Sequence, residues 1–265
     1  MPHKVEYLAT VDPAFDAMRA CSNEDFPRHA HDQFGIGVVV AGIHRSHSDA
    51  GLVEGGANDL ILVNPGEVHD GMVVDAGSRS WQMLYIDPAR LQALARELRE
   101  GAGSEFALHR PVLSDAKAAS RFAAAFDAAT DTAGAGTDRV DLALLDLLDA
   151  FGFARTSRSL PDAPLVRKVL DRINDDPVHD MSLQALASES GCSRFALYRA
   201  FLGRTGLSPQ AYMTQQRLAI ARRLIRGGSS IADAAAAAGF FDQSHLHRHF
   251  TKVFGVPPGR YQRQR

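Results

Sequence analysis

The sequence lacks the features that mark secreted or membrane-inserted proteins. Its first residues, MPHKVEYLATVDPAF, do not form a basic stretch followed by an apolar run, so no signal peptide is predicted. Its apolar runs are far shorter than the roughly 20 residues needed to cross a bilayer. The only two cysteines, Cys21 and Cys192, exclude a disulfide framework and favour a reducing compartment. We therefore expect a cytoplasmic protein with no membrane partner.

Positive charge is scarce in the first part of the chain and abundant in the last. Residues 1–160 hold 14 Lys+Arg and 23 Asp+Glu, a balance of −9, whereas residues 161–265 hold 15 and 8, a balance of +7; together these give the −2 of the whole chain. A basic segment joined to an acidic one is typical of a polyanion-binding domain linked to a domain with another task. The sequence therefore predicts at least two domains.

A repeated phrase stands out in the basic segment. FLGRTGLSPQAY at residues 201–212 returns as FTKVFGVPPGRY at residues 250–261. The shared positions lie 49 residues apart and are Phe201/Phe250, Gly206/Gly255, Pro209/Pro258 and Tyr212/Tyr261. Helical apolar spacing runs through the whole segment from residue 165, so the repeat predicts one helical unit built twice.

The repeat has the packing requirements of a helix-turn-helix unit, which are a small residue, a turn glycine and an apolar anchor. The first unit supplies Ala187, Gly191 and Leu197. The second supplies Ala235, Gly239 and Leu246, with one extra residue in its turn, so the offset is 48 before the turn and 49 after it. Between the units we expect one long helix, from Pro209 to about Arg226, stopped by Gly227 and Gly228. The expected helix N-caps are Ser182, Ser193, Ser208, Ser230 and Asp242.

The second helix of each unit is expected to turn a polar face outward. The exposed residues would be Arg194, Tyr198 and Arg199 in the first unit and Gln243, Ser244, His247 and Arg248 in the second. Arginine can bond guanine with two hydrogen bonds, glutamine can read adenine, and the others can bond bases or phosphates. A connecting helix of about 18 residues spans roughly 27 Å at 1.5 Å per residue, so both units could enter successive major grooves of double-stranded DNA.

From about Ser182 to Tyr261 the chain resembles the AraC/XylS transcription regulators. The resemblance rests on LASESGCSRFALYRAF, RLAIARRLI and AGFFDQSHLHRHFTKVFGVPPGRY. It implies base contacts at Phe195, Tyr198 and Arg199, and at Gln243, Ser244, His247 and Arg248. His245 and Leu246 stand where the family usually has two aromatic residues, so the sequence preference of the second unit is less well indicated. RNA polymerase would be a further partner if the protein is an activator.

The acidic half reads as strands between residues 34 and 86, with a turn at Gly42. RHAHDQFGIG and NPGEVHDG resemble the small β-barrel of the cupin superfamily over roughly residues 26–87, and in AraC-type regulators this barrel usually holds a small effector. His29, His31 and His69 match the three histidines of metal-binding cupins, but Gln33 stands nearest to the usual carboxylate.

These histidines have three interpretations, namely hydrogen bonding within the barrel, effector contact and metal ligation. The missing carboxylate argues against a catalytic metal, so we assign His29, His31 and His69 to effector contact and expect no metal, no cofactor and no catalytic residues. Trp81, Met83 and Tyr85 alternate onto one face of a strand. Trp81 would either floor an effector pocket or belong to the core.

Amphipathic helices are expected at residues 88–100, 114–130 and 139–153. The last carries an apolar stripe of Leu142, Leu145, Leu148 and Ala150, which would pack on the barrel or pair with a second subunit. We favour a homodimer. The polar stretch GFARTSRSLPDAP, residues 152–164, is expected to be a linker.

The sequence thus predicts an α+β protein in which a cupin-like β-barrel and helices precede an all-α domain with two helix-turn-helix units. The predicted divisions are an effector domain (1–100), a helical dimerisation or connecting segment (101–155), a linker (156–164) and a DNA-binding domain (165–265). The predicted function is sequence-specific transcription regulation under a small-molecule effector, without enzymatic activity. The alternative is a metal-dependent cupin enzyme with a helical appendage.

Overall fold

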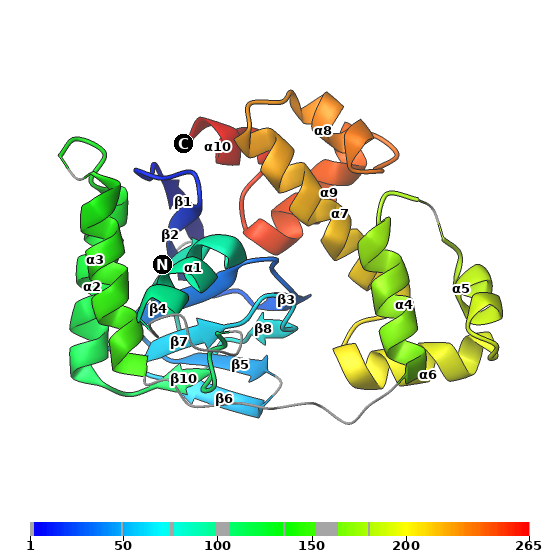
Figure 1. The fold of residues 1–265 in the computed structure, drawn as a ribbon, viewed down its shortest axis with the longest axis horizontal. Coiled ribbons are helices and arrows are strands. Elements are labelled where there is room, and N and C mark those ends of the chain that lie inside the picture. Colours follow the sequence, from blue (N-terminus) through cyan, green and yellow to red (C-terminus); the bar gives the residue numbers. More distant parts are fainter. Residues whose placement is uncertain are drawn as a thin grey trace. The chain divides into compact units, whose positions relative to one another are not determined.

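The computed structural model describes residues 3–48, 50–74, 77–98, 106–134, 136–151, 164–179 and 181–264. The chain divides into two compact units: an N-terminal domain with the strands and the helices up to residue 151, and a C-terminal domain with the helices from residue 164 on (Figure 1). In the described part of the chain, no helix is both long and apolar enough to cross a membrane. The predicted linker lies outside the described residues except for Pro164. The domain limits that the sequence suggests remain predictions.

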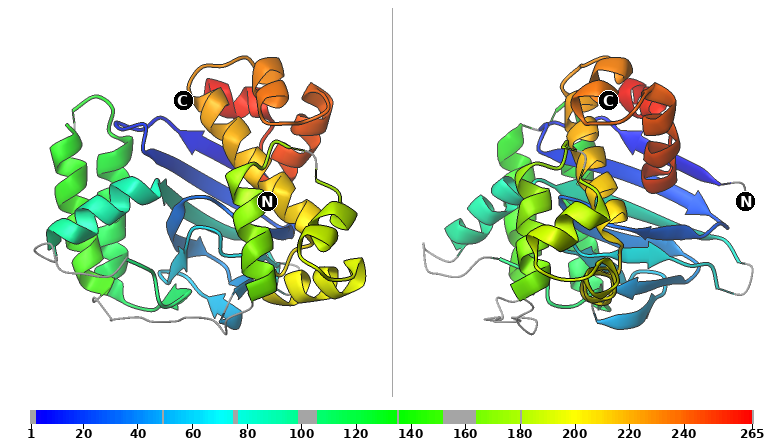
Figure 2. Two further views of the ribbon diagram at one scale, coloured as in Figure 1. Left: turned by 45° about the vertical axis from the view of Figure 1, so that its right-hand side comes forward. Right: turned by 90° about the vertical axis from the view of Figure 1, so that its right-hand side faces the viewer.

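The main sheet of the N-terminal domain is antiparallel throughout and has the strand order β1-β2-β9-β4-β7-β10. Its strands are β1 (Lys4–Leu8), β2 (Phe15–Ser22), β4 (Phe34–Ala41), β7 (Leu60–Val63), β9 (Arg79–Ile86) and β10 (Val112–Leu113). Two small sheets pair β3 (Phe26–His29) with β8 (His69–Gly71) and β5 (His44–Ser48) with β6 (Gly51–Gly55). Figure 2 shows the strands of this domain lying side by side.

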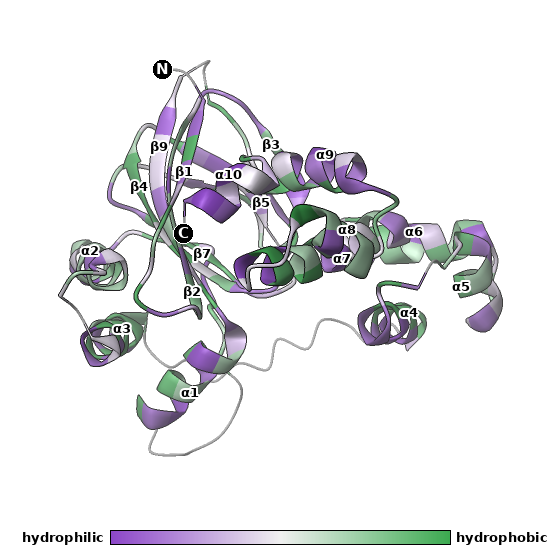
Figure 3. Cartoon of the chain, turned by 90° about the horizontal axis from the view of Figure 1, so that it is seen from above, coloured by the Kyte–Doolittle hydropathy of each residue, from purple (hydrophilic) through white to green (hydrophobic). Residues whose placement is uncertain are grey.

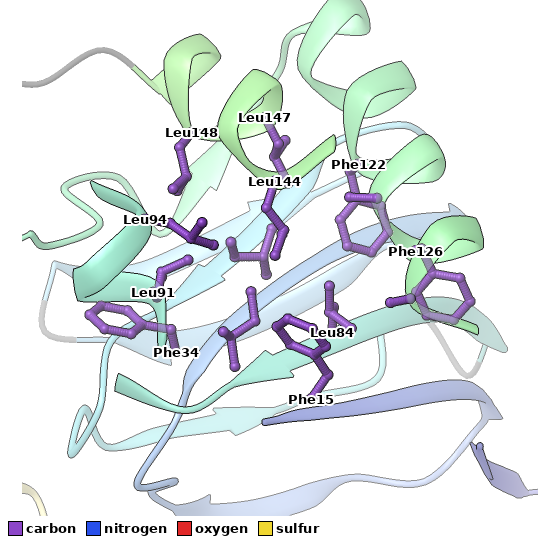
Figure 4. Packing of buried hydrophobic residues seen from close by; sticks show 14 of the residues in the cluster. Phe15, Phe34, Leu84, Leu91, Leu94, Phe122, Phe126, Leu144, Leu147 and Leu148 are labelled. Carbon is purple, nitrogen blue, oxygen red and sulfur yellow. The ribbon is translucent and has the colours of Figure 1, made fainter. Parts of the chain in front are cut away.

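Helices cover one face of the main sheet. They are α1 (Pro88–Leu98), α2 (Ala116–Thr130) and α3 (Thr137–Phe151). Between them and the sheet, alternate strand residues such as Phe15 and Leu84 form one buried cluster with Phe122, Phe126 and Leu144 of the helices (Figure 4). Removal of this apolar surface from water, at about 25 cal/mol per Å², is the main source of stability for the domain.

The opposite face of the main sheet has a different lining. Successive side chains of a strand point to opposite faces, so Trp81, Met83 and Tyr85 of β9 point away from the face that Leu84 shares with the helices. All three are buried. Trp81 is thus a buried residue on the face opposite the helices, and whether it also contacts an effector stays a prediction.

The strands predicted between residues 34 and 86 are confirmed as β4, β5, β7, β8 and β9, and Gly42 makes the expected turn with a φ of 77°. The predicted strand region was too narrow, because β1 and β2 precede it and belong to the main sheet, where β1 pairs with β2 and β2 pairs with β9. The α+β class is confirmed, but the strands form three sheets in place of a continuous barrel. The β4–β9 register shifts between Val39 and Ala41, and Gly42 then turns the chain into β5, which pairs with β6 instead.

The C-terminal domain is all-α, as predicted. Its helices are α4 (Pro164–Asp175), α5 (Leu183–Glu189), α6 (Arg194–Thr205), α7 (Pro209–Arg226), α8 (Ile231–Ala237), α9 (Gln243–Phe254) and α10 (Pro258–Arg263). The long helix α7 begins after the N-cap Ser208 and ends at Gly227, which confirms both predicted limits. Several helices, α4 among them, show both hydrophilic and hydrophobic colouring in Figure 3, as amphipathic helices of a small domain should.

The close packing of β4 against β9 on the sheet face that carries Trp81 can be tested by substitution of Gly37. A Cβ added to Gly37 would collide with the Met83 sulfur and lie 2.5 Å from the backbone oxygen of Gln82. We expect Gly37→Ala to lower the free energy of unfolding of the N-terminal domain by about 1–3 kcal/mol, as overpacking does. Denaturant unfolding measures this change. Gly136→Ala is the control, because its Cβ would enter open space, and equal stability of the two variants would contradict the packing.

Candidate nucleic-acid interface and effector site

The sequence repeat of the C-terminal domain is a structural repeat. Helices α5 and α6 form the first helix-turn-helix unit, and α8 and α9 form the second. In each turn the glycine adopts a positive φ, 68° at Gly191 and 76° at Gly239. The same backbone hydrogen bond closes both turns: Cys192 N donates to Ala187 O at 3.0 Å, and Phe240 N donates to Ala235 O at 2.9 Å.

The extra residue of the second turn can now be identified. Up to Phe240 the turns match at an offset of 48, whereas the N-caps Ser193 and Asp242 match at 49. The inserted residue is therefore Phe241, whose side chain is 92% exposed. The sequence located an insertion in this turn but did not mark Phe241 as a surface residue of interest. A single residue in the turn between two helices belongs to neither helical period, so it gives no periodic signal.

The repeated phrase encodes the same packing in both units. Leu197 and Phe201 of α6 are fully buried, as are their counterparts Leu246 and Phe250 of α9. Phe201 meets Tyr212 with ring centroids 5.7 Å apart, and the second copy repeats this pair as Phe250 and Tyr261 at 5.4 Å. Edge contacts of this kind add to the stability that area burial provides. Both α6 and α9 end at a glycine with a φ of 72°, Gly206 and Gly255.

The residues predicted to contact DNA share one property, exposure to solvent on α6 or α9. They are Arg194, Phe195, Tyr198 and Arg199 on α6 and Gln243, Ser244, His247 and Arg248 on α9. The Arg199 guanidinium lies 5.5 Å from the centroid of the Phe195 ring, which is itself 69% exposed. The second helix of each unit thus presents cationic and hydrogen-bonding groups, while its opposite side holds the domain together.

The histidines proposed for the effector site do converge. One ligand nitrogen from each of His29, His31 and His69 lies within 4.8 Å of the others, and no other described His, Cys, Asp or Glu side chains form such a group. Nδ1 of His69 lies 3.0 Å from the carbonyl oxygen of Glu67, so it donates its proton there and Nε2 carries the lone pair. Burial lowers the pKa of His69 to about 4, so the ring is neutral near pH 7.

The cluster has the nitrogen donors for a transition metal. Two nitrogens that each lie about 2.1 Å from one ion are at most about 4.2 Å apart, which is close to the 4.8 Å within which these three nitrogens lie. Gln33, at the position where metal-binding cupins have a carboxylate, donates to Asp87 Oδ1 at 3.1 Å. The group identified among the described residues contains no carboxylate.

Sequence reasoning missed one residue of this sheet face, Arg79. It stands two positions before Trp81 on β9 and therefore on the same face. Its guanidinium carbon lies 5.1 Å from the Trp81 ring and 5.9 Å from the Phe26 ring. The side chain is only 2% exposed. Its place in the alternation with Trp81 was the available signal, but arginine is rarely buried, so residue type alone does not point to this position.

Two family descriptions match this chain. Residues 12–148, which are 137 of the 265, match the AraC-like ligand binding domain, and residues 186–264 match a helix-turn-helix domain. The chain belongs to the AraC family of transcription regulators. The predicted family is confirmed, and so is the predicted function of a regulator with an N-terminal ligand-binding domain and a C-terminal DNA-binding domain.

Similar proteins include other regulators of this AraC type. The chain is 25% identical over 232 residues to the uncharacterized HTH-type transcriptional regulator YbfI of Bacillus subtilis, covering 84% of this chain and 82% of YbfI. It is 33% identical over 138 residues to the transcriptional activator NphR of a Rhodococcus species, covering 52% of this chain but 40% of NphR. ToxT from Vibrio cholerae O395 has the same fold, with a TM-score of 0.57, 12% identity and coverage of 99% of this chain and 97% of ToxT.

These likenesses assign the family but not the roles of single residues. The eight DNA-contact residues remain a prediction, as do the effector contacts of His29, His31, His69 and Trp81. The DNA-contact role is supported by the exposure of its eight residues on α6 and α9. The effector-contact role is supported by the position of its four residues in the ligand-binding domain.

The interface on α6 and α9 generates a direct test. We expect the double variant Arg199→Ala, Arg248→Ala to bind the DNA immediately upstream of its own gene about 100-fold or more weakly, because each lost arginine contact costs about 1–3 kcal/mol. A gel-shift titration measures the affinity, and its dependence on salt should become less steep. Arg96→Ala, which removes an exposed arginine of α1, is the matched control. Unchanged affinity of the double variant would exclude this interface.

Proposed function

We propose that this AraC-family regulator reads a promoter with α6 and α9 together, and that a small molecule bound by the N-terminal domain controls that reading. The observation that carries the proposal is the structural repeat, in which two matching helices expose cationic and hydrogen-bonding residues from one compact domain. The surplus of positive charge after residue 160 supports binding to a polyanion.

The length of the helix that connects the two units is comparable to the spacing of the grooves of DNA. Helix α7 connects the two units and has 18 residues, which correspond to about 27 Å at 1.5 Å per residue. Successive major grooves on one face of DNA are roughly 34 Å apart. A single chain would therefore contact two neighbouring grooves, with Arg199 in one and Arg248 in the other, and sequence specificity would come from both.

Two features support control by an effector. One is the match to a ligand-binding domain, and the other is the face of the main sheet that carries the aromatic side chains of Trp81 and Tyr85. ToxT, which shares the fold, has been crystallised with an unsaturated fatty acid bound. We infer that the N-terminal domain of this chain is a cupin-like sensor and not an enzyme, since the relatives are regulators. The effector alters DNA binding only to the extent that it binds one arrangement of the protein better than another. The protein would act in the cytoplasm, with RNA polymerase as a partner if it activates.

We expect the effector to be found by its effect on stability. A ligand that binds only the folded protein raises the free energy of unfolding by mass action, by about 2.7 kcal/mol at 100 times its Kd. A thermal-shift screen with metabolites should therefore give hits that also change the gel-shift affinity. A hit without any effect on DNA binding would contradict effector control.

The rival function is a metal-dependent enzyme, and the convergence of His29, His31 and His69 is the observation in its favour. We expect purified, dialysed protein to contain far less than one equivalent of iron, manganese or zinc, because the cluster identified among the described residues has no carboxylate. Elemental analysis measures this. Stoichiometric metal that is lost in His29→Ala, with Gln33→Ala as the comparison, would support the enzyme instead.

A homodimer through α3 is the proposed assembly. The apolar residues predicted to form one stripe on α3 differ in exposure. Leu148 is buried in the core between the helices and the sheet, whereas Leu142 is 68% exposed. Leu142 would supply an apolar contact for a second subunit. We expect light scattering to give a mass of about 57 kDa, twice the 28.7 kDa of one chain, and Leu142→Glu to reduce it to that of one chain. Wild-type protein that is monomeric at micromolar concentration would exclude this assembly.

A further inference from the structure

Arg79 is a buried cation within the ligand-binding domain. Its side chain is 2% exposed, and burial lowers the pKa of its guanidinium, an effect that the nearby Asp25 carboxylate opposes. Burial of a charge without a bonded counter-charge is costly. Within the described part of the chain, Asp25 forms no ion pair with Arg79, and its carboxylate accepts a hydrogen bond from Val73 N at 2.7 Å. No direct ion pair among the described residues therefore offsets the free-energy cost of burying the Arg79 guanidinium.

The hydrogen bonds of Arg79 are incomplete. Nη2 donates to two neutral acceptors, the carbonyl oxygens of Gly71 at 3.0 Å and Glu24 at 3.2 Å. Nε and Nη1 are buried and have no acceptor among the described residues. Guanidinium groups bond carboxylates with two parallel N–H donors, so these donors suit an acidic group.

A second polar group beside Arg79 is also unused. The His44 ring lies 5.8 Å from Trp81, and its buried Nδ1 has no hydrogen-bond partner among the described residues. Burial and the Arg79 charge lower the pKa of His44 to about 4, so the ring is neutral near pH 7 and Nδ1 can carry a proton. A Cβ on Gly71 would lie 3.1 Å from Arg79 Nη2 and 3.5 Å from His44 Cε1, so the two side chains flank the same glycine.

Apolar surface adjoins these donors. Trp81 and Phe26 meet edge to face at 5.6 Å and both lie against the guanidinium. A cavity of about 230 Å³ is lined by Arg79 together with Gly42, Ile43, Val73, Val74, Gly77 and Ser78. This volume is below the 300–1,000 Å³ that is usual for drug-sized ligands, and most of the walls are apolar or glycine. Phe26, His44 and Trp81 are not among the residues that line this cavity, and Arg79 is the residue that joins it to the ring group. A small molecule with one anionic group and a short apolar body would suit such a cavity.

We propose that Arg79 anchors the effector through a carboxylate, with its unused Nε and Nη1 donors on the acid and the apolar body in the cavity beside Ile43 and Val73. The proposal rests on the proposed function, in that it names the chemical class of the effector that the N-terminal domain binds. It assigns the binding role chiefly to Arg79, with Trp81 against the guanidinium as a reporter, and leaves the three-histidine cluster outside the anchor.

Trp81 is the single tryptophan of the chain, so its fluorescence reports on this site directly. The experiment titrates the full-length protein with benzoate and octanoate, and in parallel with the neutral analogues benzamide and octanamide. We expect a saturable change with at least one carboxylate, with affinity at least about tenfold above that of its amide, because hydrogen bonds to charged groups contribute about 1.5–3 kcal/mol. Equal affinity of acid and amide, or no saturable change with either acid at millimolar concentration, would overturn the proposal.

Variants separate a binding role of Arg79 from a structural one. We expect Arg79→Met to lose the carboxylate response and, without ligand, to unfold at the same or a higher temperature, since it removes a buried charge. Arg19→Met is the control, because Arg19 is exposed on the helix-covered face of the same domain. A ligand-free Arg79→Met variant that is strongly destabilised, or that still prefers the carboxylate, would overturn the proposal.

Gel shifts on the same preparations keep the two hypotheses apart. Intact DNA binding with no carboxylate response counts against the Arg79 anchor alone. A saturable carboxylate response in a protein that binds no promoter DNA supports the anchor and contradicts the proposed function.

Discussion

Packing of both helix-turn-helix units against α7 is the interaction on which the C-terminal domain depends. Helix α7 contacts α6 of the first unit and α8 and α9 of the second, and it also contacts α4 and α10. Its buried side chains, Tyr212, Leu218 and Ile225 among them, complete cores that either unit would be too small to form alone. Because each unit also closes a Phe–Tyr ring pair onto the chain that follows it, the two reading helices are held by equivalent contacts.

The N-terminal domain separates stability from binding by using the two faces of one sheet. The face covered by α1, α2 and α3 is closed by aromatic and aliphatic residues such as Phe15 and Phe122. The other face combines rings with polar groups, including Trp81 and Arg79, which is an arrangement that costs stability unless a ligand completes it. Natural proteins break packing rules chiefly at functional sites, so this face is where a regulator of this family would place its effector.

The sequence predicted the C-terminal domain well because its signals are local. The N-caps Ser182, Ser193, Ser208, Ser230 and Asp242 all cap helices in the structure. Each cap is a hydrogen bond between residues three positions apart, so a short stretch of sequence specifies it. The repeat shows the same pattern in both units, which gives two independent indications of the same structure. The strands were harder, since β2 pairs with β9 more than 50 residues later and its own sequence, FDAMRACS, mixes charged and apolar residues. Pairing over that distance depends on the whole domain.

The site was predictable in part for the same reason. The seven polar residues on α6 and α9 follow from helical periodicity, whereas Phe195 was implied by the family resemblance. The convergence of His29, His31 and His69 was indicated by their resemblance to cupin motifs. Arg79 was not found, because composition favours an exposed arginine, whereas contacts with residues distant in sequence, such as Phe26 and Glu24, surround its guanidinium. A buried charge is specified by long-range structure, which a local pattern does not contain.

The most direct test of the central claim, that one chain reads two grooves, is a hydroxyl-radical footprint of the promoter with the single variants Arg199→Ala and Arg248→Ala. Each variant should lose protection over a different segment, and the segment centres should lie about one helical turn, roughly 10 base pairs, apart on one face of the DNA. Loss of the same segment in both variants, or no loss in either, would contradict the account.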